Sequence, residues 1–333
     1  MKILSFTSVI IILCTTFLFG QSTTIKFASL APEGSTWLNV MREYDAAVKE
    51  ATAGKVKFRI YPGGIMGDEK TVLRKIRLGQ LHSAGFTGVG LGEILPEVRI
   101  LDSPFLFENY DEVDFITSKF RDKFAQAFAE KGYVLLGWAE VGFVYVFTNT
   151  PIHSKADMKK VNMWMWEGDP VARATFEALD IQAKPLSVIE VMTSLQTGMI
   201  DGVYISPLAI LGLQWFTKVK YMTQLPLAMA AGAVLISKKQ FDELTPEQQK
   251  ILLENGKIYF NKLKKLAREE NEKSIETLKN NGIQVTPAPE GAALAELKEA
   301  GAKARQIMAN ELFSPSLLKE MEDALVEFRK TKN

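Results

Sequence analysis

The sequence predicts an α/β protein made of two lobes. Apolar segments with a two-residue period alternate with amphipathic helical segments in the first part of the chain, which is the pattern of βαβ units around a parallel sheet. Without its predicted leader the chain keeps about 310 residues, enough for two separate hydrophobic cores. Two long extended segments, Tyr133–Thr148 and Lys220–Lys238, are expected to cross between the lobes.

Residues 1–20 have the pattern of a secretory signal peptide. Lys2 supplies the positive start, Ile3–Phe19 is the apolar segment, and a glycine ends it. The apolar segment is short for a membrane span, and polar residues follow it. Cys14 suggests a lipoprotein as an alternative, although Leu13 is larger than the residue that usually precedes such a cysteine. We therefore expect a cleaved protein in the periplasm.

The charge balance argues against a nucleic-acid or anionic-surface partner. The whole chain has 40 basic and 39 acidic residues, and removing Lys2 with the leader leaves 39 of each, so the net charge is zero. The single cysteine lies in the leader, so no disulfide is expected. An exported chain without disulfides suggests a bacterial envelope protein that its hydrophobic cores stabilise.

The first lobe is predicted from five alternating elements. One face of its first helix carries large apolar side chains at helical spacing, which predicts burial against a sheet. A Pro-Gly-Gly turn closes the second strand. The elements are a strand at Thr24–Leu30, a helix at Thr36–Thr52, a strand at Val56–Tyr61, a helix at Asp68–Leu81 and a strand at Ser83–Thr87. We assign residues 21–148, with 236–275, to this lobe.

The glycine-rich segment Gly88–Gly92 is expected to be a loop rather than a nucleotide site. Glu93 stands where a dinucleotide fingerprint needs its third glycine, and no Lys-Ser or Lys-Thr pair follows for a phosphate loop. After it, Leu101–Phe107 is an apolar segment bent by Pro104, and Tyr110–Lys131 is a predicted helix.

The second lobe is organised around Lys160–Pro170. Val161–Trp166 is a predicted buried strand, and Asp169 is an N-cap residue that opens the next helix. α/β proteins bind ligands beyond the carboxyl ends of such strands. The remaining elements are a helix at Val171–Leu179, a strand at Ile181–Leu186, a helix at Val188–Met199 and a strand at Val203–Ile205. We assign residues 149–235, with 276–333, to this lobe.

A very long helix is predicted near the C-terminus. Thr245-Pro246-Glu247 has the composition of a helix start, and the amphipathic pattern runs to about Asn280. We expect this helix to lie across both lobes, with further helical segments from Pro289.

The sequence offers no convincing catalytic or metal motif. His82 and His153 lack the spacing of zinc ligands, and no Gly-x-Ser-x-Gly elbow occurs. Acidic pairs such as Asp68/Glu69 fall in helix first turns, where they complement the helix dipole. We therefore predict a binding protein without cofactor or metal rather than an enzyme.

Aromatic side chains are the main candidates for a ligand site. They lie on predicted strands or just after them, where they either pack in the core or line a pocket for an apolar ligand. Trp164 and Trp166 share one strand face by the two-residue period. The candidate ligand-binding residues are Trp37, Phe86, Phe105, Phe143, Val144, Tyr145, Trp164, Trp166 and Tyr204.

Several segments, in order and spacing, resemble one family. The chain is similar to the extracytoplasmic solute-binding subunits of tripartite ATP-independent periplasmic (TRAP) transporters of the DctP type. The resemblance implies a two-lobed periplasmic binding protein fold that closes on a small molecule, with the membrane permease subunits as partners. The segments are Ile25–Leu30, Tyr61–Gly64, Gly67–Lys70, Arg77–Leu81, Ser103–Phe107, Glu190-Val191, Leu195–Gly198, Ile200–Gly202 and Leu244–Ile251.

Two departures from the family concern the ligand. Family members that bind organic acids hold the carboxylate with arginines, and the resemblance places Trp164 and Val144 at those positions. A buried carboxylate without a partner is costly, so we expect an apolar or amphiphilic ligand. A family subset of this kind is found with a periplasmic tetratricopeptide-repeat protein, which becomes a candidate partner. The alternative is an organic acid held by another cation, such as Arg173 or a bound metal.

Overall fold

The computed structural model describes residues 22–332, and the predicted leader lies outside them. Three parallel strands begin the first lobe: β1 (Thr23–Ala28), β2 (Val56–Tyr61) and β3 (Ser83–Thr87). Two long strands continue the same sheet, since β9 (Ala228–Ser237) runs antiparallel to β3 and β4 (Tyr133–Thr148) runs antiparallel to β9. The predicted βαβ alternation is confirmed here.

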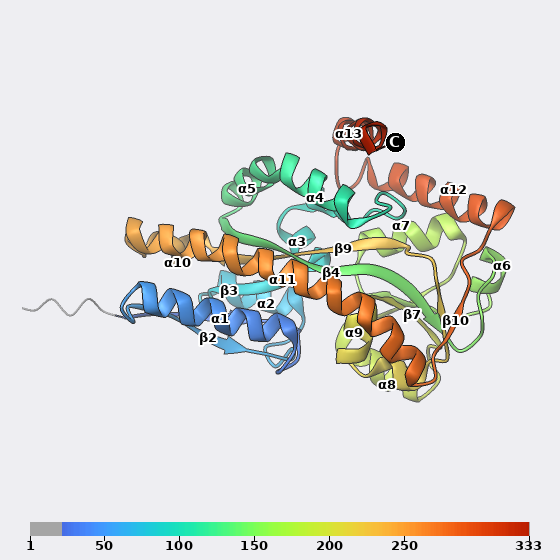
Figure 1. Cartoon of the computed structure of the whole chain (residues 1–333), viewed down its shortest axis with the longest axis horizontal. Coiled ribbons are helices and arrows are strands. Elements are labelled where there is room, and N and C mark those ends of the chain that lie inside the picture. Colours follow the sequence, from blue (N-terminus) through green and yellow to red (C-terminus); the bar gives the residue numbers. More distant parts are fainter. Residues whose placement is uncertain (1–21, 333) are drawn as a thin grey trace, which may run out of the picture.

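The strands β4 and β9 carry the chain between the lobes, as the two extended segments predicted. The first part of β4 pairs with β9, whereas its end pairs with β7 (Gly202–Ile205) and β8 (Tyr221–Thr223), and β8 pairs with β10 (Gln284–Thr286). A register shift in β4 lies at Gly142, whose φ of 109° only glycine adopts readily. One bent sheet therefore runs through both lobes (Figure 1).

Helices cover both faces of the first lobe. The apolar face predicted for α1 is buried, because Met41, Tyr44 and Val48 are at most 2% exposed. The predicted helix from Tyr110 is divided at Phe120 into α4 and α5. The helices are α1 (Thr36–Ala51), α2 (Glu69–Arg77), α3 (Gly88–Ile94), α4 (Tyr110–Lys119) and α5 (Arg121–Glu130), with a 3-10 helix η1 (Pro96–Asp102).

The glycine-rich segment is a helix, so the loop prediction is wrong. The Thr87 side chain caps α3 by accepting a hydrogen bond from the Val89 N–H. Glycine has a low intrinsic helix propensity, so tertiary contacts, described below, hold this helix.

The second lobe contains short elements around a two-stranded parallel sheet. The strand predicted from Val161 is shorter, since only β5 (Trp164–Trp166) pairs with β6 (Lys184–Leu186). Asp169 caps α7 (Pro170–Leu179) through its side chain, as predicted. The remaining elements are α6 (Lys155–Met158), η2 (Val188–Glu190), α8 (Val191–Gln196), α9 (Pro207–Gly212) and η3 (Trp215–Lys218).

The long helix is confirmed as α11 (Pro246–Asn280), and α10 (Lys238–Asp242) precedes it. Thr245 and Gln248 form a reciprocal capping box at its start. The helix packs against α1 of the first lobe, along β4, and against α9 of the second lobe (Figure 1). It therefore spans both lobes.

The two C-terminal helices pack on different lobes. α12 (Gly291–Met308) lies against α7, and its buried side chains join the apolar cluster of the second lobe. α13 (Pro315–Lys332) lies against α4 and contributes to the cluster of the first lobe (Figure 1). The assignment of 276–333 to the second lobe stays a prediction. Within residues 22–332, no helix is both long and apolar enough to cross a membrane.

Candidate ligand-binding site

A large cleft lies between the two lobes. Its volume is about 780 Å³, and it is lined by the ends of β1 and β3, by α3 and η1, and by β5, α7, β7 and α9 of the second lobe. Most of the lining side chains are apolar. Pockets of this size and lining are typical of sites for small molecules.

Six of the nine predicted ligand-binding residues line this cleft. The first lobe contributes Trp37 from α1 and Phe86 from β3, and the crossing strand β4 contributes Val144. The second lobe contributes Trp164, Trp166 and Tyr204.

Phe105, Phe143 and Tyr145 do not line the cleft. Phe105 packs beside Gly301 of α12, against the apolar cluster of the second lobe. Phe143 lies in the core of the first lobe, with its ring centroid 4.8 Å from that of Tyr110. Tyr145 lies between two apolar clusters. The register shift at Gly142 interrupts the alternation of β4, so the sequence period does not identify the cleft side of this strand.

Trp164 is mainly a core residue. Its exposed fraction is 2%, its indole N–H donates to the Leu186 carbonyl at 3.0 Å, and its ring stacks on Tyr204 with centroids 5.1 Å apart. Trp215 meets the same ring edge-on. Trp166 is half-buried, so it presents more of its indole to the cleft than Trp164 does.

A buried ion cluster forms one wall of the cleft. Arg99 of η1 places Nε 2.8 Å from Asp102 Oδ2 and Nη2 2.9 Å from Asp169 Oδ1, and all three side chains are at most 9% exposed. Arg99 and Asp102 belong to the first lobe, whereas Asp169 caps α7 of the second. Arg99 therefore joins the two lobes at the cleft.

Glu69 is the fourth buried charged residue of this wall. Its carboxylate accepts hydrogen bonds from the Thr87 N–H at 2.7 Å, the Thr87 hydroxyl at 2.9 Å and the Gly90 N–H at 2.6 Å. Burial raises the pKa of Glu69 to about 7, against the lowering effect of these donors. The predicted dipole role suits Asp68, which caps α2, while Glu69 turns into the protein.

The glycines of α3 make room for these charged side chains. A Cβ on Gly88 would lie 1.7 Å from Asp102 Oδ2, one on Gly90 would lie 2.7 Å from Glu69 Oε2, and one on Gly92 would lie 2.7 Å from Arg99 Cδ. Close approach of the charged residues is therefore the reason for a glycine-rich helix at this place.

Burial also raises the pKa of Asp102, to about 6, although the adjacent Arg99 lowers it. Asp102 Oδ1 accepts a hydrogen bond from the Ala231 N–H of β9 at 2.7 Å. The pKa of the Tyr204 hydroxyl is raised by burial and by the nearby Asp169, so Tyr204 remains neutral.

The sequence reasoning missed Arg99, Asp102 and Glu69. Arg99 lies between Val98 and Ile100 in an apolar segment, and a charged residue in such surroundings is the signal that could have indicated its burial. The alternative cation, Arg173, does not line the cleft. It is exposed on α7 and pairs with Glu177 and Glu311. No group of three or more metal-ligating side chains occurs within residues 22–332.

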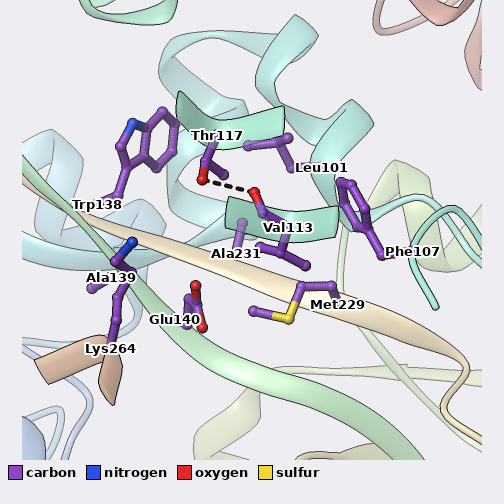
Figure 2. Close-up of a pocket in the computed structure, with 10 residues that line it drawn as sticks. All are labelled: Leu101, Phe107, Val113, Thr117, Trp138, Ala139, Glu140, Met229, Ala231 and Lys264. Carbon is purple, nitrogen blue, oxygen red and sulfur yellow. Dashed lines mark hydrogen bonds between the residues drawn. The ribbon is translucent and has the colours of Figure 1, made fainter. Parts of the chain in front are cut away.

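A second cavity, drawn in Figure 2, is too small for a ligand. Its volume is about 10 Å³, the room that one water molecule needs. Trp138, Thr117 and Glu140 lie around it, and the buried Trp138 Nε1 has no hydrogen-bond partner among the described residues.

A comparison with known protein families identifies the family of this chain. A family model described as DctP, bacterial extracellular solute-binding protein, family 7, matches residues 27–313. The chain belongs to this family. The resemblance inferred from the sequence is thus confirmed. Members of the DctP family are solute-binding transport proteins rather than enzymes.

Similar proteins include some that are named for acid ligands. The 2,3-diketo-L-gulonate-binding periplasmic protein YiaO of Escherichia coli is 25% identical over 247 residues, which are 73% of this chain and 75% of the relative. The C4-dicarboxylate-binding periplasmic protein DctP of Rhodobacter capsulatus is 23% identical over 260 residues, 78% of each chain.

Solved structures of similar proteins have the same fold. A Bordetella pertussis extracytoplasmic solute receptor binding pyroglutamic acid has a TM-score of 0.84 at 22% identity, covering 91% of this chain and 99% of that one. A TRAP periplasmic solute-binding protein from Pseudomonas putida with bound D-glucuronate has a TM-score of 0.83 at 23% identity, covering 90% and 97%. The predicted two-lobed fold is confirmed by these similarities.

Proposed function

We propose that this chain is the periplasmic subunit of a TRAP transporter that captures a small organic acid with an apolar body. Arg99 carries the proposal, because it is the only arginine or lysine among the described residues that line the cleft. A guanidinium in a mostly apolar cavity favours a carboxylate, since its N–H donors match the geometry of the two oxygens.

The relatives support an acid as the ligand. Those named above are described with a keto sugar acid, C4-dicarboxylates, pyroglutamic acid and D-glucuronate. The main expectation from the sequence is an apolar or amphiphilic ligand, and these relatives favour its alternative, an organic acid held by a different cation. In this proposal Arg99, from the opposite lobe, takes the role of the arginine that the resemblance expects at the position of Trp164.

The apolar lining distinguishes the proposed ligand from a sugar acid. A single cation compensates one carboxylate, so a dicarboxylate leaves its second charge without a partner. Apolar walls such as Val144, Met192 and Leu213 offer no hydrogen bonds to several hydroxyl groups. We therefore expect a monocarboxylate with an aliphatic or aromatic body.

A second candidate is a neutral amphiphile. The predominance of apolar lining residues favours it, and such a ligand needs no ion pair with Arg99. In either case the permease subunits of the transporter are the expected receivers of the ligand. The periplasmic tetratricopeptide-repeat protein stays a predicted partner.

Isothermal titration calorimetry with matched ligands tests the proposal. We expect octanoate to bind at least tenfold more tightly than octanamide, D-glucuronate or succinate. Arg99→Lys keeps the charge but loses the planar fork, so octanoate affinity should fall by about 10- to 100-fold, the effect of one charge-assisted hydrogen bond.

Arg173→Lys is the matched control, because Arg173 is an exposed arginine outside the cleft. The Arg173→Lys variant should bind octanoate with the affinity of the wild type. Circular dichroism and a melting temperature show whether each variant is folded. Equal affinity for octanoate and octanamide would instead support the neutral amphiphile.

A further inference from the structure

The ion cluster of the cleft wall contains more negative than positive groups. Arg99 contributes one positive charge, whereas Glu69, Asp102 and Asp169 contribute three negative charges when ionised, so the cluster has a net charge of −2. These residues come from α2, η1 and the N-cap of α7, and each is at most 7% exposed. Solvent therefore screens their interactions poorly.

An acid ligand adds a fourth carboxylate to this wall. The guanidinium already has Asp102 and Asp169 within 2.9 Å, so a ligand carboxylate beside it meets a net negative charge while Glu69, Asp102 and Asp169 are all ionised. The other charged residues nearby give little relief. Lys70 pairs with Glu93 beside the cleft, Glu270 on the far side is acidic, and Tyr204 is neutral.

Glu69 is the group that can become neutral at least cost to the cluster. Unlike Asp102 and Asp169, it makes no ion pair with Arg99, so its protonation breaks no salt bridge. The Thr87 hydroxyl, which donates to Glu69 Oε2, can rotate and accept a hydrogen bond from a protonated carboxyl group. Burial already raises the pKa of Glu69 to about 7.

We propose that an acid ligand binds together with one proton, which the Glu69 carboxylate holds in the complex. The proton comes from the buffer, and the only new bond is the O–H of the Glu69 carboxyl group. This inference rests on the proposed function, since it requires that the ligand is an acid.

Proton uptake is measured by titrating the full mature protein with octanoate at pH 8.0 in two buffers, phosphate and Tris, whose ionisation enthalpies differ. We expect about 0.9 proton to be taken up at pH 8.0, since a free Glu69 with a pKa near 7 is then mostly ionised. Uptake should fall to about 0.1 proton at pH 6.0, where free Glu69 is already mostly protonated, and the Kd should rise about eightfold between pH 7.5 and 8.5.

Glu69→Gln mimics the protonated side chain, so its octanoate binding should be independent of buffer and of pH between 7 and 8.5. Glu93→Gln is the control, because Glu93 is a partly exposed glutamate of α3 outside the cleft, and it should keep the uptake of the wild type.

The two proposals fail in different ways. Octanoate binding with the same observed enthalpy in both buffers at pH 8.0 overturns proton uptake and leaves the acid ligand intact. Full uptake in a folded Glu69→Gln variant overturns Glu69 as the proton holder. Absence of octanoate binding at every pH removes both proposals together.

Discussion

Replacing Arg99 by methionine should be among the most destabilising single changes in this protein. The change leaves Asp102 and Asp169, which lie 2.8 and 2.9 Å from the guanidinium, as buried carboxylates without a cation. Removing one partner of a buried ion pair costs about 3–5 kcal/mol. That is a large share of the 5–15 kcal/mol typical of a folded domain, so we expect the variant to fold with a lowered free energy of unfolding.

The loss should depend on pH with a defined sign. Burial raises the pKa of Asp102 to about 6 in the wild type, and removing Arg99 raises it further. A carboxyl group whose pKa is higher in the folded state than in the unfolded state loses stabilising free energy as pH rises. Arg99→Met should therefore cost more at pH 8.0 than at pH 5.5, where Asp102 is protonated and neutral.

Urea unfolding at both pH values, followed by tryptophan fluorescence, measures the effect. Arg173→Met is the matched control, because Arg173 makes only exposed ion pairs, which contribute about 0–1 kcal/mol. Adding Asp102→Asn to Arg99→Met should recover about 1–3 kcal/mol at pH 8.0, since it removes a buried charge. A loss for Arg99→Met as small as that of the control at both pH values would refute the reasoning.

Two further changes test the packing and titration of the same wall. Gly88→Ala places a Cβ 1.7 Å from Asp102 Oδ2, so thermal unfolding should show a loss of about 2 kcal/mol or more, whereas Gly212→Ala, which meets no atom within 4 Å, should be neutral or slightly stabilising. Glu69→Gln should flatten the pH dependence of the free energy of unfolding, because the raised pKa of Glu69 makes the wild type less stable as pH rises from about 5 to 8. A pH profile parallel to the wild type would contradict that assignment, and a fully stable Gly88→Ala protein would contradict the packing.

Much of the fold was predictable because its signals are local. The capping box at Thr245, the N-cap at Asp169 and the period of α1 depend on residues within one or two helical turns. The helix α3 was not predictable in this way. Its glycines disfavour a helix locally, and the reason for them, the close approach of Asp102 and its neighbours, appears only in three dimensions.

The aromatic part of the site was partly predictable. Large aromatic side chains at strand ends are common both in cores and in clefts. The sequence therefore predicted a ligand role for Trp166 and Tyr204, which line the cleft, and also for Phe105 and Phe143, which pack elsewhere. Trp164 shows what a strand pattern does not indicate. Its position in the strand was read correctly, but its burial between Tyr204 and Trp215 depends on segments about 40 to 50 residues away.

The sequence by itself determined the α/β class, the crossing strands, the long helix and the family, because periodicity, caps and ordered motifs survive as patterns along the chain. The tertiary structure alone decided which charges meet in the cleft. Arg99, Asp169 and Glu69 are separated by 30 to 100 residues, and no local pattern encodes a contact that forms only when two lobes pack together.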